Sequence, residues 1–177
     1  MNYPAIAKIG NPVLQAPAQL VTNVLEPNLQ KLIDSLIATA IAHRGVGIAA
    51  PQISLPYRLL VVASHPSERY PHAPKMAPKV MINPRLIAHG QTQVKDWEGC
   101  LSVPNTRGLV SRYQEITVEY ATREGEVKQE ILTGFIARIF QHELDHLNGI
   151  LFIERIADKK DLYTEAEYQQ IISSRTI

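Results

Sequence analysis

The stretch TGFIARIFQHELDHLNG, from Thr133 to Gly149, decides the fold of this chain. Its apolar residues recur at helical spacing, as expected for a helix with one face in the core. These apolar residues are Phe135, Ile136, Ile139, Phe140 and Leu147. The pair Asn148–Gly149 is typical of the left-handed turn that ends a helix. We therefore predict a core helix that begins near Thr133 and ends near Leu147.

This helix contains the sequence His142-Glu143-Leu144-Asp145-His146, an HExxH motif. Residues four apart lie on one face of a helix, so both imidazoles can reach the same metal ion. Glu143 is turned from the two histidines but remains close enough to act as a base on a water beside that ion. So short a pattern also arises by chance on a polar helix face. The motif favours a metallohydrolase with His142 and His146 as ligands and Glu143 as the catalytic base.

A catalytic metal site needs a third protein ligand and a position left open for water and substrate. The residues after His146 read LNGILFIERI, and they lack the third histidine of the metzincin pattern. The remaining candidates are Cys100, the only cysteine, and four histidines: His43, His65, His72 and His89. A lone cysteine is more often a small buried apolar residue than a ligand. The four histidines lie near Pro-rich or loop segments, where we expect them to be solvated.

Two further helices and several short strands are expected outside this region. Apolar residues recur at helical spacing over residues 28–43, with Asn28 as the N-cap and Gly45 just beyond the end. Strands are expected over residues 58–63, 80–83, 115–120 and 127–131, the last two forming a hairpin. Thr164 and Glu167 have capping-box spacing, which predicts a short helix over about residues 164–174. The predicted fold class is α+β, with antiparallel strands and hairpins packed around the central helix that carries the HExxH motif.

Prolines mark two segments as neither central strand nor helix. Residues 1–27 hold four of them, which predicts an extended, turn-rich arm. Residues 64–79 hold four more, which predicts a Pro-rich surface excursion. The stretch GVGIAAPQ over residues 45–52 is expected to be a loop. No repeat or linker divides the chain, so we expect residues 1–177 to form a single catalytic domain.

Composition narrows the classes of protein that fit this chain. A hydrophobic content of 45% with 20% charged residues is typical of a globular protein. The net charge of +1 comes without a basic stripe, which argues against sequence-specific nucleic-acid binding. No apolar run is long enough to span a membrane, and the N-terminal residues lack a leader pattern. A single cysteine cannot form an internal disulfide, which fits a reducing compartment. We expect a cytoplasmic protein that acts on no membrane.

Three segments resemble, in order and spacing, the signature motifs of the peptide deformylase family. They are GVGIAAPQ (Gly45–Gln52), EGCLS (Glu98–Ser102) and QHELDH (Gln141–His146). The resemblance runs from the early helix to Phe152. The intact EGCLS is more similar to bacterial-type enzymes than to animal mitochondrial ones. This favours a bacterial cytoplasmic protein, with a plastid origin as the alternative.

The resemblance implies a hydrolase that removes the formyl group from the N-terminal formyl-methionine of newly synthesised polypeptides. Cys100 would join His142 and His146 in holding one divalent ion, with Fe²⁺ as the native ion and Zn²⁺ or Ni²⁺ possible in a preparation. A metal-bound hydroxide would attack the formyl carbon, with Glu143 as general base and then general acid. The partners implied are formyl-methionyl peptides and nascent chains near the ribosome exit. We expect a monomer.

The resemblance also implies further residues of the site. The backbone N–H of Leu101 and the side-chain amide of Gln52 would be hydrogen-bond donors to the formyl oxygen as negative charge grows there. Candidate substrate-binding residues are Gly45, Val46, Gly47, Glu98, Gly99, Arg107, Phe135 and Ile139.

Some of these assignments have an equally simple structural alternative. Phe135 and Ile139 share a helix face with the histidines, so they either line a methionine pocket or belong only to the core. Glu98 and Asp145 either orient the histidines or form solvated salt bridges. Arg107 either contacts the peptide or is a surface arginine.

Two other functions are alternatives for a chain with this motif. A zinc endopeptidase would share His142, Glu143 and His146 and would cleave internal peptide bonds. A non-catalytic, metal-stabilised binding module would want four protein ligands and would have no use for Glu143. A metal with three protein ligands and one water would favour an enzyme over the binding module.

Overall fold

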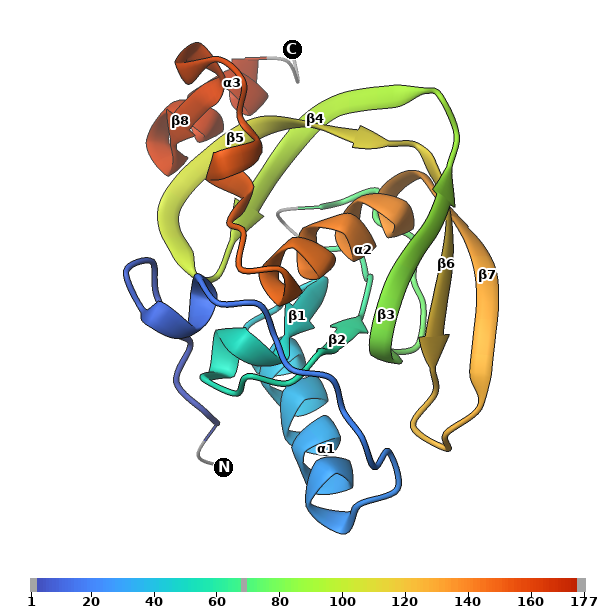
Figure 1. Ribbon diagram of the computed structural model, residues 1–177. Coiled ribbons are helices and arrows are strands. Elements are labelled where there is room, and N and C mark those ends of the chain that lie inside the picture. Colours follow the sequence, from blue (N-terminus) through green and yellow to red (C-terminus); the bar gives the residue numbers. More distant parts are fainter. Residues whose placement is uncertain (1–2, 68–69, 175–177) are drawn as a thin grey trace.

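The computed structural model describes residues 3–67 and 70–174 of the chain. Two antiparallel sheets surround helix α2 (Gly134–Leu147), which packs against strands of both (Figure 1). This arrangement confirms the predicted α+β class with a central helix that carries the HExxH motif. Gly149 adopts a φ of 74° just after the helix, which confirms the left-handed turn expected there.

The larger sheet has five strands in the order β1-β2-β3-β6-β7, and all neighbours are antiparallel. The strands are β1 (Gly47–Ala49), β2 (Leu59–Val62), β3 (Lys79–His89), β6 (Glu115–Ala121) and β7 (Val127–Thr133). The expected hairpin is confirmed, because β6 pairs with β7. The alternating residues Ile116, Val118 and Tyr120 of β6 are buried on one face.

The smaller sheet has the order β4-β5-β8 and was not predicted as strands from the sequence. Its strands are β4 (Gln93–Cys100), β5 (Val103–Tyr113) and β8 (Leu162–Thr164). Residues 93–96 are all exposed, so β4 begins without the apolar alternation that usually marks a strand. Its pairing with β5 extends from Gln93 to the tight turn after Cys100.

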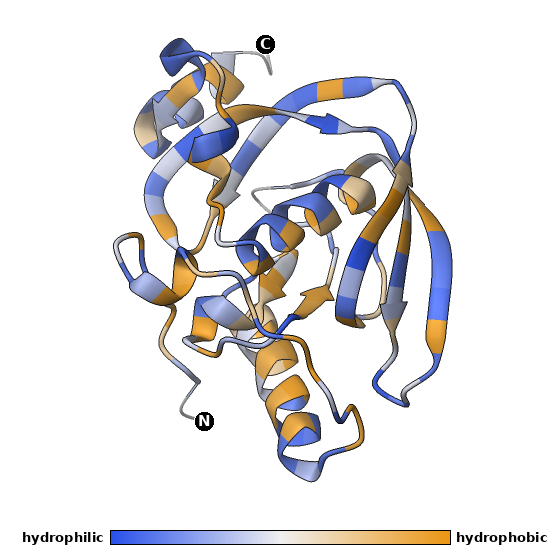
Figure 2. Cartoon of the chain, viewed as in Figure 1, coloured by the Kyte–Doolittle hydropathy of each residue, from blue (hydrophilic) through white to orange (hydrophobic). Residues whose placement is uncertain are grey.

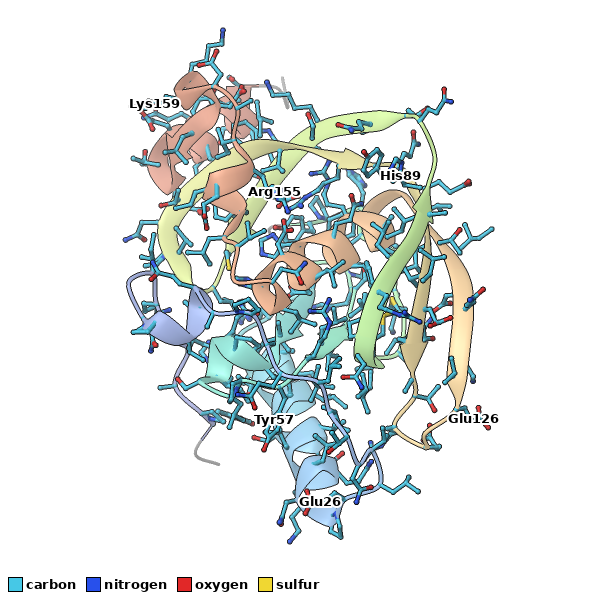
Figure 3. All side chains as sticks on the ribbon, in the orientation of Figure 1. Glu26, Tyr57, His89, Glu126, Arg155 and Lys159 are labelled. Carbon is cyan, nitrogen blue, oxygen red and sulfur yellow. The ribbon has the colours of Figure 1, made fainter. Side chains whose placement is uncertain are left out.

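Helix α1 (Pro27–Ala42) begins one residue before the predicted Asn28, and Glu26 is its N-cap. The Glu26 carboxylate accepts hydrogen bonds from the backbone N–H groups of Asn28 and Leu29, and Pro27 fills the first helical position (Figure 3). The prediction of Asn28 as the cap was therefore wrong. Ile33, among others, is fully buried against the larger sheet, and hydrophobic residues recur along the helix (Figure 2).

Two further boundaries differ from the sequence predictions. Strand β3 continues to His89, well past the predicted end at Asn83, because a register shift accommodates Pro84 within the strand. The stretch expected to be a loop contains β1 and the short 3₁₀ helix η2 (Ala50–Ile53). Both elements are too short to show a periodic pattern in the sequence.

The remaining elements are short. They are the 3₁₀ helices η1 (Pro12–Leu14), η3 (Phe152–Arg155) and η4 (Lys159–Asp161), and the C-terminal helix α3 (Glu165–Ser174). The described residues of the Pro-rich excursion, 64–67 and 70–78, form neither helix nor strand. Within the described part of the chain, no helix combines the length and apolar character needed to cross a membrane.

Candidate metal centre

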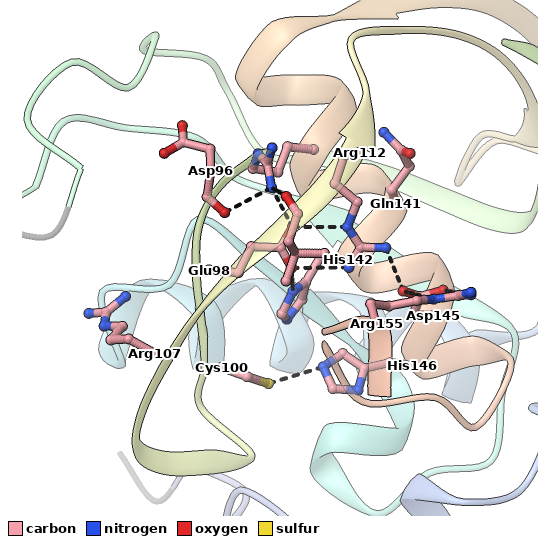
Figure 4. A network of polar contacts seen from close by, with 12 residues as sticks. Asp96, Glu98, Cys100, Arg107, Arg112, Gln141, His142, Asp145, His146 and Arg155 are labelled. Carbon is pink, nitrogen blue, oxygen red and sulfur yellow. Dashed lines mark hydrogen bonds and ion pairs between the residues drawn. The ribbon is translucent and has the colours of Figure 1, made fainter. Parts of the chain in front are cut away.

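The end of β4 and the second half of α2 bring three potential metal ligands together. The ligand atoms of Cys100, His142 and His146 all lie within 4.8 Å of one another. Cys100 Sγ is 3.1 Å from His146 Nε2 (Figure 4). Among the described residues, no other group of three His, Cys, Asp or Glu side chains could hold a metal ion. The four other histidines therefore lie outside this group.

The donor atoms present fit a divalent ion. Burial alone would raise the pKa of the Cys100 thiol, but the adjacent imidazoles of His146 and His142 outweigh it and hold the pKa well below its usual value. A thiolate with two imidazoles is a ligand set that suits zinc or ferrous iron. His142 uses Nδ1 to contact Glu98 at 2.9 Å, which leaves its Nε2 for an ion. The site thus offers one sulfur and two nitrogen ligands.

A buried carboxylate, Glu98, holds the first of these histidines in place. Its Oε1 accepts hydrogen bonds from Arg112 Nε at 2.9 Å and from Arg138 at 2.8 Å. Its Oε2 contacts Arg112 at 3.0 Å and His142 Nδ1 at 2.9 Å. Burial alone would raise the pKa of Glu98, yet the hydrogen bonds from His142 and Arg112 hold it well below its usual value. Glu98 thus orients His142, and the salt bridges that it forms are buried rather than solvated.

Asp145 has a different role from Glu98. It forms ion pairs with Arg112 at 2.6 Å and with Arg155 at 2.6 Å (Figure 4). Its carboxylate makes no hydrogen bond to His146, whose buried Nδ1 has no partner among the described residues. Asp145 therefore forms salt bridges rather than a contact to His146, and its carboxylate is buried, not solvated as the sequence alternative expected. Through Arg112 it extends the charged network around Glu98 toward Arg155.

Glu143 lies beside the metal-ligand group, and its carboxylate is buried. The residue is only 4% exposed, and its Oε2 has no hydrogen-bond partner among the described residues. Burial raises the pKa of Glu143 to about 7, against the opposing effect of the two nearby imidazoles. A buried carboxylate without a partner is costly to stability, and such groups mark functional sites.

The two expected oxyanion donors flank Cys100. Gln52 Oε1 accepts the Ala49 N–H at 2.8 Å, which fixes the orientation of the amide. Its Nε2 therefore faces Cys100 Sγ at 3.5 Å and Ser102 Oγ at 3.3 Å. Leu101 follows Cys100 in the turn between β4 and β5, and its carbonyl accepts a hydrogen bond from Lys8 at 2.8 Å.

A pocket open to solvent lies over this group of residues. Most of the predicted substrate-binding residues line it, namely Gly45, Val46, Gly47, Glu98, Gly99, Phe135 and Ile139. Sequence reasoning missed four others, which are Arg44, Tyr70, Trp97 and Arg138. Arg44 and Trp97 adjoin two of the three signature motifs, so their position beside a motif was an available signal. Tyr70 lies in the Pro-rich excursion and packs on Phe135 with ring centroids 5.0 Å apart, a contact with no local signal in the sequence.

Arg107 does not line this pocket, and it is not a surface arginine either. It is 1% exposed, and its Nε donates to Glu165 Oε2 at 2.7 Å. Arg107 lies on β5, and Figure 4 shows it apart from Arg112, which binds Glu98. Its guanidinium instead connects the smaller sheet to the C-terminal helix.

The chain is similar to known proteins over most of its length. Residues 4–162 match the family model described as polypeptide deformylase. Peptide deformylase 2 of Nostoc sp. is 52% identical over 171 residues, covering 97% of this chain and 96% of that enzyme. Peptide deformylase 2 of Shewanella oneidensis is 45% identical, covering 85% of this chain and 82% of that enzyme.

Solved structures show the same likeness. The class I type b peptide deformylase from Acinetobacter baumannii, with Met-Ala-Ser bound, has a TM-score of 0.84 and 45% identity, covering 88% of this chain and 99% of that one. The peptide deformylase from Thermotoga maritima has a TM-score of 0.79 and 36% identity, covering 89% of this chain and 100% of that one.

The Gly47→Ala substitution tests how closely β1 approaches the Glu143 carboxylate. A methyl group at Gly47 would lie 2.6 Å from Glu143 Oε1 and 2.7 Å from Ile139 Cγ2, so one of them must move. We expect the rate of formate release from a formylated peptide to fall about 10²-fold, the usual cost of misplacing a reacting group by about 1 Å. Gly90→Ala is the control, because its methyl group would meet nothing nearer than 3.7 Å. Equal rates for both variants would contradict this placement of Glu143.

Proposed function

The chain belongs to the polypeptide deformylase family, metal-dependent hydrolases that remove the formyl group from nascent peptides, and on this premise we propose how its own residues perform the reaction. The observation that carries the proposal is the buried Glu143 carboxylate, whose Oε2 has no hydrogen-bond partner among the described residues and which lies beside the Cys100, His142 and His146 side chains. A structural metal site would have no need of such a group.

The proposed reaction begins with the three ligands. Cys100, His142 and His146 would hold one divalent ion. That ion, when bound, supplies a Lewis acid that lowers the pKa of a neighbouring water and polarises a carbonyl oxygen. Glu98 keeps the His142 ring in the orientation that leaves its Nε2 available.

Glu143 moves the proton in both halves of the reaction. Its Oε2 accepts a proton from the water that attacks the formyl carbon, and the same carboxyl group then delivers that proton to the departing nitrogen. The formyl C–N bond breaks, and the products are formate and a peptide with a free N-terminal amine. A pKa of about 7 suits a group that must both take and give a proton near neutral pH.

The donors at the formyl oxygen are the Gln52 side-chain amide and the Leu101 backbone N–H. Both residues line the pocket beside Cys100. The hydrogen bond from the Ala49 N–H to Gln52 Oε1 turns the amide nitrogen toward the site before any substrate arrives. Donors fixed in this way stabilise charge that develops only as the oxygen becomes negative.

The methionine side chain would bind against the apolar part of the pocket. Val46, Phe135 and Ile139 line it beside Glu143, and they come from two segments far apart in the sequence. Phe135 and Val46 are half-buried, while Ile139 is 4% exposed and also belongs to the core. The two predicted roles of Ile139, pocket and core, are therefore compatible.

The remaining parts of the proposal concern the ion and the setting. Iron in the ferrous state is proposed as the native ion: the ligand set suits it as well as zinc, and the choice of iron follows the resemblance to the deformylase family. We place the enzyme in a bacterial cytoplasm, as a monomer that acts on nascent chains near the ribosome exit. The two relatives described above come from the bacteria Nostoc sp. and Shewanella oneidensis, which supports a bacterial source.

Glu143→Gln tests the proposed role of Glu143. Glutamine keeps the shape of the side chain but cannot take a proton, so we expect kcat to fall by ~10² to 10⁴-fold or more, with the metal retained. The substrate is formyl-Met-Ala-Ser, chosen because the Acinetobacter enzyme binds Met-Ala-Ser. Formate release, product mass and metal content are measured together.

Three results of this assay would contradict the proposal. A near-normal kcat of Glu143→Gln with the metal bound would exclude Glu143 as the proton carrier. Cleavage of internal peptide bonds by the wild-type protein would favour the endopeptidase instead. A wild-type protein that holds metal but releases no formate would favour the binding module.

Oxygen sensitivity tests Cys100 as a ligand. Protein loaded with Fe²⁺ without air should be active and should lose activity on aeration, while the Zn²⁺ form stays active, because ferrous iron oxidises and its thiolate ligand can become a sulfenic or higher acid. Mass spectrometry should find the added oxygen on Cys100, the chain's only cysteine. Cys100→Ser should bind metal more weakly, because a neutral hydroxyl replaces a charged, soft ligand. Normal metal binding by this variant, with an air-stable iron form, would exclude Cys100.

A further inference from the structure

The wall of the pocket formed by Trp97 and Gly99 has the C-terminal segment packed behind it. The Trp97 ring centroid lies 4.9 Å from that of Tyr163 and 4.9 Å from that of Tyr168, and both contacts are edge-on. Trp97 itself lines the pocket. The match to the family model ends at residue 162, just before both tyrosines. The support for this wall therefore comes from a part of the chain outside the family match.

Arg107 carries a second contact between the C-terminal segment and the same wall. Its guanidinium binds the Glu165 carboxylate through Nε at 2.7 Å and through a terminal nitrogen at 3.3 Å, and it lies 4.8 Å from the Tyr168 ring centroid. A methyl group at Gly99 would lie 2.5 Å from the other terminal nitrogen of Arg107. The guanidinium is therefore pressed against the backbone of Gly99, next to Cys100.

The same guanidinium also contacts a second wall of the pocket. Its terminal nitrogen next to Gly99 lies 3.5 Å from the hydroxyl of Tyr70, in the Pro-rich excursion. The Tyr70 ring in turn packs on Phe135. One buried cation, held by Glu165, thus touches Gly99 and Tyr70, both of which line the pocket.

We propose that residues 162–168 form a C-terminal brace that positions the substrate-binding wall, with Glu165 and Tyr168 as its positioning residues. The inference rests on the proposed function, since it concerns how the formylated peptide is held. Glu165 fixes the guanidinium of Arg107 against Gly99, and Tyr168 supports both Arg107 and Trp97. Glu165 and Tyr168 act on the wall through Arg107 and Trp97, neither of which is proposed to move a proton or bind metal. Loss of the brace should therefore weaken peptide binding while leaving the chemical step largely intact.

Kinetics of two brace variants test this proposal. For Glu165→Gln and Tyr168→Leu we expect the KM for formyl-Met-Ala-Ser to rise about 3- to 10-fold. Tyr168→Leu loses an aromatic pair and a cation–π contact, and Glu165→Gln loses the charge of its ion pair with Arg107. The kcat should stay within about 2-fold, as expected when only uniform binding is lost. Tyr168→Phe keeps the ring and should behave as wild type. Gln170→Ala, an exposed position on the same helix, is the second control.

Fluorescence gives a readout that does not depend on turnover. Trp97 is the only tryptophan, so tryptophan emission, excited selectively over the seven tyrosines, reports on this wall alone. Titration with the product peptide Met-Ala-Ser should change the emission of the wild-type protein. The midpoint of that change should move to about 3- to 10-fold higher peptide in Glu165→Gln and Tyr168→Leu, matching the expected change in KM. A melting temperature for each variant shows whether the fold is retained.

The possible outcomes separate this inference from the proposed function. A wild-type protein that binds Met-Ala-Ser but releases no formate would contradict the proposed function, while the midpoints of the brace variants would still test the brace. Wild-type KM and midpoint values in Glu165→Gln and Tyr168→Leu would overturn the brace. So would a loss of kcat in step with melting temperature at unchanged KM, because that result indicates a purely structural role.

Discussion

The buried carboxylate of Glu98 binds two arginines and a histidine, and these interactions tie strand β4 to strand β5 and to helix α2. Each of these charged groups is less than 12% exposed at its side chain. A buried charge that loses its partner is strongly destabilising, so the members of the network hold one another in place. The network fixes how α2 is rotated against the smaller sheet. That rotation decides whether His142 and His146 face Cys100 or some other part of the molecule.

The metal centre therefore depends on contacts far apart along the chain. The HExxH motif places two ligands and a base on α2. The sulfur ligand, Cys100, lies at the end of β4, and the side-chain amide belongs to Gln52 in η2. Glu143 Oε2 has no hydrogen-bond partner among the described residues, whereas both carboxylate oxygens of Glu98 accept hydrogen bonds. The difference separates their tasks, because Glu98 stays charged and fixed while Glu143 remains able to exchange a proton.

The sequence predicted those helices and strands whose buried residues form a periodic apolar pattern, and it missed those that lack such a pattern. Helix α2, its end at Gly149 and the β6–β7 hairpin follow from apolar spacing and turn residues. The residues in the first half of strand β4 are all exposed, so its sequence lacks the buried apolar alternation that indicates a strand. For Glu98, Asp145 and Arg107 the sequence left two roles each, because the partner of a charged residue depends on tertiary packing. The partners of Arg107, which are Glu165, Tyr168 and Tyr70, could not be read from local sequence at all.

The most direct test of the central role of Glu98 is the metal affinity of Glu98→Gln, measured by competition with a chelator. Glutamine keeps the shape but removes the charge and replaces one acceptor with an N–H donor, which would face the donors of Arg112 or His142. Metal affinity should fall about 10- to 100-fold, and the free energy of unfolding should fall by about 3 to 5 kcal/mol. Glu126→Gln, at an exposed carboxylate, should change neither quantity. Wild-type metal affinity and stability in Glu98→Gln would contradict the dependence of the metal centre on this carboxylate.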